Sequence, residues 1–303
     1  MTVMGVLAAF GGGIFGAAIG ALPAFEFVGF LVIAGVAVQL GVAPAATDFF
    51  GLPFGAFGPH VGGFASGVAA VAYAAKRGKI ETGRNIVAGL MGLKSPDVLL
   101  VGGLFGIFGY AVQWGLAKVP AFGPGLAWTD TVALTVVLSA FVARLAFGSS
   151  GLFGKAEEGR AFLSPSDGAK WLSFQSDPGQ LVTIGLGVGL FAGYLALTFG
   201  GAGVLLSFGI AAASLIFLQF GVAVPVSHHM ALPAAIAAAA SGSMIWAAVV
   251  GIVCAFIGEL MARLFLCHGD THIDPPAATI AIMTLVINFL TSVGFFAAVH
   301  LPV

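Results

Sequence analysis

Charged residues are scarce in this sequence. Only 8% of the 303 residues are Asp, Glu, Lys or Arg, whereas 59% are hydrophobic. The mean hydropathy of +1.10 lies well outside the range of soluble domains. The net charge of -1 gives no indication of a nucleic-acid partner. The composition therefore excludes a soluble domain and indicates an integral membrane protein with the lipid bilayer as its main partner.

Two further scarcities narrow the class. The chain has only two cysteines, Cys254 and Cys267, so a disulfide framework is excluded. Its apolar runs also lack the ten-residue alternation of polar and apolar residues that is typical of a membrane barrel. Instead, the runs reach roughly 20 residues, which is the length of a membrane-spanning helix. We therefore expect an all-α polytopic membrane protein.

The positions of the apolar runs predict about ten transmembrane helices. Two more apolar stretches, residues 51–63 and 84–94, are rich in Gly or too short to span, and we expect them to be re-entrant. The predicted crossings are residues 4–22, 27–46, 61–76, 97–117, 130–148, 180–198, 203–222, 226–241, 244–265 and 277–298.

One long polar stretch divides the chain. Residues 149–179 are predicted to be a linker between a first membrane unit, residues 1–148, and a second one, residues 180–303. The basic segment "KRGKIETGR" belongs on the cytoplasmic side by the positive-inside rule. With ten crossings in the cell (inner) membrane, this orientation places the linker in the cytoplasm and both termini outside.

Several features recur in the same order in the two halves. Glycines at four-residue spacing, which allow close helix packing, occur near the start of each half, and "VQLGVA" recurs as "LQFGVA". Five crossings in each half would make the second half enter the membrane upside down. We therefore expect two inverted five-helix repeats. The matched residues are Gly12, Gly16 and Gly20 with Gly185, Gly189 and Gly193, Gln39 with Gln219, Asp130 with Asp274, and Thr135 with Thr279.

The aspartates of this last match each precede a predicted helix. Asp at such a position caps the free backbone N–H groups, and Pro275 suits a first helical turn. If these helices begin inside the membrane, their positive dipole ends would face a central pathway. The residues predicted to line this pathway or bind substrate are His60, Asp130, Thr135, His228, His229, Asp274 and Thr279.

Histidines gather around the short stretch "CHGDTHID", residues 267–274. Imidazole and carboxylate groups suit zinc or another divalent metal, although the spacing matches no specific zinc signature, and ordinary loop histidines are the competing interpretation. The predicted metal donors are His228, His229, His268, Asp270 and His272.

Four charged residues within the apolar runs have structural interpretations. Glu259 and Arg263 are spaced to form an ion pair on one helix face. Glu26 and Arg144 lie near predicted span ends, from which a long side chain reaches water.

The stretch "AGLMGLKSPDVLLVGG", residues 88–103, resembles a motif of the bacterial urea transporters. Gly89, Leu90 and Gly92, followed by Leu100-Val101-Gly102, match the family pattern, whereas its Asn and its Leu-Pro-x-x-Thr signature are absent. The resemblance implies two inverted five-helix halves with short re-entrant pore helices, assembled as a homo-oligomer, usually a trimer.

Three functions fit these features. The first is a channel or transporter that passes a small solute, such as a neutral or weakly polar molecule or a divalent metal ion, between the two repeats. It needs no cofactor and is not an enzyme. The second is a membrane-embedded metal-dependent enzyme acting on a lipid-soluble substrate. The third is a scaffold subunit of a larger membrane complex.

Overall fold

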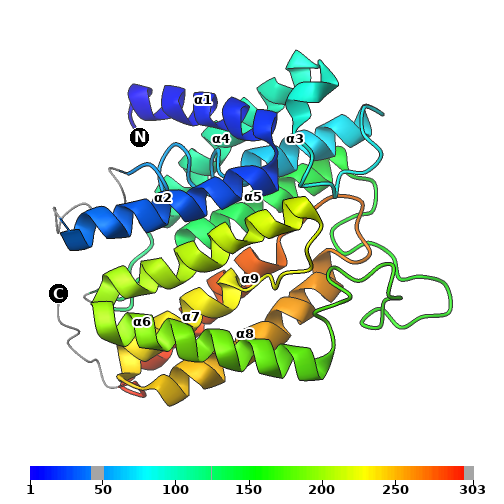
Figure 1. Ribbon diagram of the computed structural model, residues 1–303. Helices are drawn as coiled ribbons and strands as arrows, with labels where there is room; N and C mark the ends of the chain where they lie inside the picture. The colour runs from blue at the N-terminus through cyan, green and yellow to red at the C-terminus, as the bar shows by residue number, and fades with distance from the viewer. Residues whose placement is uncertain (42–50, 124, 297–303) are drawn as a thin grey trace.

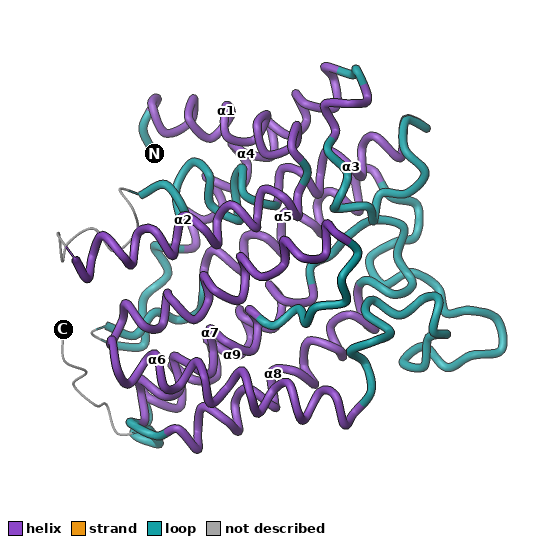
Figure 2. Tube along the Cα trace, in the orientation of Figure 1, coloured by secondary structure: helices purple, strands orange, loops and turns teal. Residues whose placement is uncertain are grey.

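The computed structural model describes residues 1–41, 51–123 and 125–296, and within these ranges it is all-helical (Figures 1 and 2). The outer ends of the predicted crossings 27–46 and 277–298 lie outside the described residues. The α-helices are α1 (Val3–Ile19), α2 (Ala21–Gly41), α3 (Ala65–Lys76), α4 (Pro96–Leu116), α5 (Thr131–Phe147), α6 (Pro178–Ala213), α7 (His228–Ser241), α8 (Met244–Phe265) and α9 (Pro275–Ser292), with short 3₁₀ helices η1 (Leu90–Leu93) and η2 (Ser214–Phe220).

Five of these helical segments are long and apolar enough to cross a membrane, as a helical membrane protein requires: α2, α4, α6 with η2, α8 and α9. The predicted number of about ten crossings is therefore wrong. α3 has 12 residues and α7 has 14, and at 1.5 Å per residue neither spans a hydrocarbon layer about 30 Å thick. Both regions are apolar enough for a membrane span. However, the residues before each helix include Gly and Pro and are not helical.

α6 contains a sharp break. Gly200 has φ 62° and ψ −138°, which is not a helical conformation, and the two arms of α6 run in opposite directions in Figure 1. A Cβ on Gly203 would lie 1.9 Å from the carbonyl oxygen of Leu195, so the chain returns directly upon itself. Only glycine adopts such a conformation readily. The predicted crossings 180–198 and 203–222 thus correspond to the two arms of one element, the second of which ends in η2.

Close backbone contacts are formed where the repeated glycines lie. A Cβ on Gly12 of α1 would lie 2.1 Å from the carbonyl oxygen of Ala56, in the segment before α3. In the same way, a Cβ on Gly189 of α6 would lie 2.5 Å from the carbonyl oxygen of Ala247 in α8. Small residues let these backbones approach to distances that larger side chains exclude. The glycine stripes are therefore explained by packing.

Replacing Gly16 of α1 with alanine should destabilise the protein by about 1–3 kcal/mol, because a well-packed contact would be overfilled. A Cβ there would lie 1.7 Å from the carbonyl oxygen of Gly62. The matched control is Gly11→Ala on the same helix, where a Cβ meets nothing within 4 Å. This control should be neutral or slightly stabilising. Thermal unfolding of both variants in detergent checks the prediction, and equal melting temperatures would contradict it.

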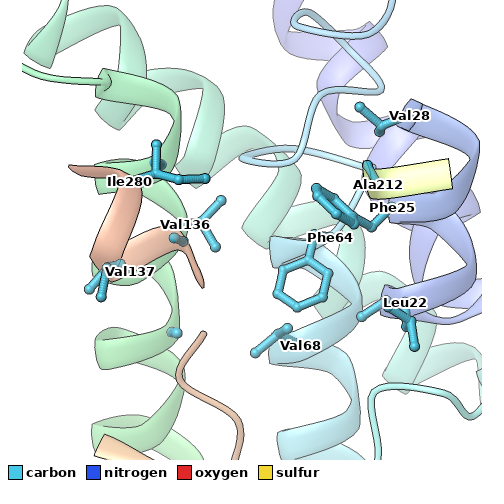
Figure 3. Packing of buried hydrophobic residues seen from close by; sticks show 14 of the residues in the cluster. Leu22, Phe25, Val28, Phe64, Val68, Val136, Val137, Ala212 and Ile280 are labelled. Carbon is cyan, nitrogen blue, oxygen red and sulfur yellow. The ribbon is translucent and has the colours of Figure 1, made fainter. Parts of the chain in front are cut away.

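A large apolar cluster lies between the two halves of the chain. It joins Phe25 of α2, Phe64, Val136 of α5, Phe208 of α6 and Ile280 of α9, and Figure 3 shows part of it. The rings of Phe25 and Phe208 meet edge to face with centroids 5.9 Å apart. Such aromatic pairs contribute beyond their buried area. This cluster fixes α2 against the second arm of α6.

Arg144 does not reach water, contrary to the prediction. It is 1% exposed, and its Nε donates to Thr271 Oγ1 at 2.9 Å while Nη1 donates to the carbonyl oxygens of Leu152 and Phe265. The guanidinium group thereby joins the end of α5 to the linker and to the loop after α8. The donors are satisfied by backbone carbonyls far away in sequence, which local patterns do not reveal.

The predictions for Glu26 and for the Glu259–Arg263 pair have opposite outcomes. Glu26 is 3% exposed and accepts a hydrogen bond from Gln219 Nε2 at 3.0 Å, so its predicted position near water is wrong. The predicted pair of Glu259 and Arg263 is confirmed, with Nε and Oε1 2.8 Å apart. Arg263 also donates to the carbonyl oxygen of Leu163, which holds the linker against α8.

Candidate functional site

A cavity of about 520 Å³ lies between the two halves of the chain. This volume is typical of sites that enclose a small molecule. Its walls come from the first turn of α2, the second arm of α6, the starts of α5, α7 and α9, and parts of the loops on one side of the bundle. Figure 3 shows Phe25 and Phe64 on one side of this region and Val136 and Ile280 on the other.

The two halves contribute matching residues to the wall. The first turns of α5 and α9 line the cavity through the same positions relative to the helix start, and α2 and the second arm of α6 each present a Leu-x-x-Phe pair. The matching residues are Asp130, Val132, Ala133 and Val136 with Asp274, Pro276, Ala277 and Ile280, and Leu22 and Phe25 with Leu205 and Phe208.

Asp130 and Asp274 cap the helices that they precede, as the sequence predicted. Asp130 Oδ1 accepts the N–H of Ala133 at 2.8 Å, and Asp274 Oδ2 accepts the N–H of Ala277 at 2.8 Å. Pro275 stands at the first position of α9, where no N–H is needed. Both carboxylates thus compensate the positive end of a helix at the cavity wall.

Thr135 and Thr279 do not line the cavity. Their hydroxyls donate to the carbonyl oxygens of Thr131 and Pro275, one helical turn earlier, and both residues are fully buried. The structure thus gives these hydroxyls a partner within their own helices, so their predicted contact with a solute has no support in the geometry. The two threonines nevertheless occupy the same place in α5 and α9.

Two of the predicted histidines face the cavity. His272 Nε2 lies 3.2 Å from Asp274 Oδ1, and the His272 ring meets Phe64 with centroids 5.7 Å apart. His228 begins α7 between the rings of Phe25 and Phe208. It is 5% exposed, and its Nδ1 has no hydrogen-bond partner. His228 is therefore a buried polar group that the described protein leaves unpaired.

His60 and His229 are buried next to the cavity region but do not line it. The carbonyl oxygen of His60 lies where a Cβ on Gly109 would be, so the segment before α3 packs directly onto α4. His229 Nε2 lies 2.5 Å from the position of a Cβ on Gly258, so its ring packs against α8. Both histidines thus serve packing contacts in this structure.

The five predicted metal donors make separate contacts. His268 Nε2 is 2.7 Å from the carbonyl oxygen of Phe162, Asp270 accepts hydrogen bonds from Ser149 and Ser150, and His272 pairs with Asp274. Over residues 1–41, 51–123 and 125–296, no three His, Cys, Asp or Glu side chains form a group that could hold a metal ion. The alternating side chains of residues 268–272 therefore join the loop to different neighbouring segments and do not form one set of metal ligands.

Asp270 ties the linker to the loop after α8. Burial alone would raise the pKa of Asp270, but hydrogen bonds from the Ser149 backbone and from the Ser150 and Ser149 hydroxyls outweigh it, so the pKa lies below its ordinary value. A carboxyl group whose pKa is lowered in the folded state stabilises the fold above its unfolded pKa. That contribution is lost as the pH falls through the lower, folded pKa.

The stability difference between the wild type and Asp270→Asn should therefore depend on pH. We expect the wild type to melt at a higher temperature above pH about 5, and the difference to shrink below the unfolded pKa of about 3.9 and to disappear as the pH falls through the lower, folded pKa. Glu158→Gln, which changes an exposed carboxylate in the linker, serves as the control for general charge effects. A difference that does not change between neutral and acidic pH would contradict the assigned role.

The sequence did not single out several wall residues. Arg84 and Asn85 come from the loop after α3, Trp171 and Leu172 from the linker, and Phe25 from α2. The Leu-x-x-Phe pattern does not single out Phe25, because the first half also has it at residues 7–10 and 138–141. For Arg84 and Trp171 no local signal exists, because the folding of distant loops places them at the cavity.

Comparison with known proteins gives a family for this chain. A model described as "Family of unknown function (DUF7973)" matches residues 1–303. The chain belongs to this family. No curated protein and no solved structure matches it. Because the family description names no activity, the function has to be argued from the cavity and its walls.

Proposed function

We propose that this protein is a multi-pass cell-membrane transporter or channel for a small solute, which passes through the central cavity between two inverted repeats. The observation that carries the proposal is the wall itself: matching positions of the two halves line one cavity. A pathway between two inverted repeats is a common architecture of transporters, with discontinuous helices at the binding site.

The packing of the helices supports the division into two repeats, residues 1–148 and 180–303. When α6 is divided at Gly200, each half has five helices in the same order. α1 packs on α3 and α4 in the first half, and α6 packs on α7 and α8 in the second. The short helices α3 and α7 follow non-helical segments in both halves. In the proposed pathway, these non-helical segments are the re-entrant elements.

The proposed orientation places the linker, residues 149–179, in the cytoplasm. The linker, the basic loop after α3 and the loop after α8 lie at the same end of the bundle (Figure 1). The contacts of Arg263 with Leu163 and of Asp270 with Ser149 support this grouping. Basic loops remain on the cytoplasmic side during insertion. The oligomeric state, a trimer by resemblance to the urea transporters, remains a prediction.

Flux into proteoliposomes tests the proposal. Purified protein should accelerate the uptake of at least one solute among urea, ammonia, small amides, short organic acids and divalent metal ions, compared with protein-free liposomes. A panel without any accelerated uptake, from protein that is folded and inserted, would contradict the proposal and favour the scaffold interpretation.

A further inference from the structure

The geometry points to a small monocarboxylate with an apolar body as the ligand of the central cavity, with its carboxylate at the start of α7. This inference rests on the proposed function, because it treats the cavity as the solute site. It is carried by three groups of hydrogen-bond donors at the cavity that have no acceptor in the described protein.

The first donors are backbone N–H groups. Among the helices that begin at the cavity, α5 and α9 are capped by Asp130 and Asp274. In α3, which has no capping side chain, backbone carbonyls accept the first two N–H groups. α7 also lacks a capping side chain, and the N–H groups of His228 and His229 donate to none of the described residues. A buried helix start with free N–H groups is a ready site for an anion.

The second donor is the His228 side chain. Only 5% of His228 is exposed, and the residue lines the cavity. Its Nδ1 has no hydrogen-bond partner among the described residues. A buried polar group without a partner costs about 1–3 kcal/mol, so a ligand that pairs with it binds more tightly. Because His228 is the first residue of α7 and lines the cavity, its ring and its own free N–H belong to the same corner of the cavity.

The third donor is the Arg84 guanidinium group. It lines the cavity from the half-exposed loop after α3, and none of the described residues forms a hydrogen bond or an ion pair with its side chain. Arginine presents a planar fork that matches a carboxylate. Arg84 would therefore attract a carboxylate at the mouth of the cavity.

The acidic groups of the cavity differ from these donors because each already has a partner. Asp274 pairs with His272 and with the N–H of Ala277, and Asp130 accepts the N–H of Ala133. The unmatched groups are thus backbone N–H groups, a guanidinium group and a histidine that donates in its Nδ1–H tautomer, and all three suit an acceptor. The remaining wall consists mainly of apolar and aromatic side chains, such as Phe25, Phe64 and Phe208, which suit an apolar body.

Isothermal titration calorimetry on the full chain in detergent tests the inference with three ligands of one shape. The affinity for phenylacetate should be at least about tenfold higher than that for benzyl alcohol or benzylammonium, and each factor of ten corresponds to about 1.4 kcal/mol. Equal or tighter binding of the alcohol or the ammonium compound, or no binding of phenylacetate, would overturn the inference.

Two variants assign the site. Ser227→Asp places a carboxylate at the start of α7, where it would cap the free N–H groups and exclude the ligand, so phenylacetate binding should fall about tenfold or more. Ser227→Ala is the matched control, because the Ser227 side chain caps nothing, and it should bind normally. The second variant, Arg84→Gln, is at a half-exposed position and should weaken phenylacetate binding without changing benzyl alcohol binding. This variant provides the test if Ser227→Asp does not fold. Unchanged phenylacetate binding in the folded variants would overturn the inference.

The experiments distinguish a failure of the ligand inference from a failure of the proposed function. Flux of neutral solutes without a preference for phenylacetate would overturn the ligand class and leave the transporter proposal standing. Tight phenylacetate binding without flux of any solute would contradict the transporter proposal and leave the binding site standing.

Discussion

Replacing Arg144 with methionine should lower the free energy of unfolding by about 3–5 kcal/mol, because a buried guanidinium group satisfies several backbone acceptors at once. Its loss leaves the carbonyl oxygens of Leu152, Phe265 and Thr271 without this donor. Methionine fills a similar volume but donates nothing. The linker and the loop after α8 should therefore detach from the end of α5.

Denaturant unfolding in detergent measures the effect. Arg160→Met is the matched control, because Arg160 is exposed in the linker and its one hydrogen bond, to the carbonyl oxygen of Ser164, is 3.5 Å long. We expect the control to change the free energy of unfolding by less than about 0.5 kcal/mol. Arg144→Lys keeps the charge without the fork and should fall between them. If Arg144→Met unfolds like the control, the bridging role is wrong.

Replacing Ala277 with tryptophan should reduce solute flux at least about tenfold, equivalent to about 1.4 kcal/mol on the barrier. Ala277 lies in the first turn of α9 on the cavity wall, and the cavity of about 520 Å³ has room for the added ring. Ala133, at the matching position of α5, should give the same result. A block from both positions is what a shared pathway between the two halves requires.

The matched control is Ile282→Trp, which lies on the same helix but is 39% exposed and does not line the cavity. Its flux should equal that of the wild type. Thermal unfolding of all three variants separates a blocked pathway from a damaged fold. Normal flux through a folded Ala277→Trp variant would place the pathway elsewhere.

Local sequence predicted the parts of the site that depend on neighbouring residues. Asp130 and Asp274 cap α5 and α9 as expected, because a cap needs only the Asp and the N–H groups three residues later. The Glu259 and Arg263 pair was also predictable, since helix geometry alone brings together residues four apart.

Sequence reasoning failed where a side chain meets a distant segment. The number of crossings was overestimated because hydropathy does not show that α3 and α7 are too short to span. The histidine and aspartate cluster at residues 268–272 suggested a metal site, yet each donor is paired with a different part of the chain.

The amino-acid sequence was enough to predict the all-helical class, the apolar surroundings and the two helix caps, because these follow from composition and from contacts within one helical turn. The folded structure was needed to find that Arg144 is a buried bridge, that the cavity is lined from both halves, and that the start of α7 is left without acceptors. These features depend on which distant backbone groups meet, and hydrogen bonds of that kind leave no periodic trace in the sequence.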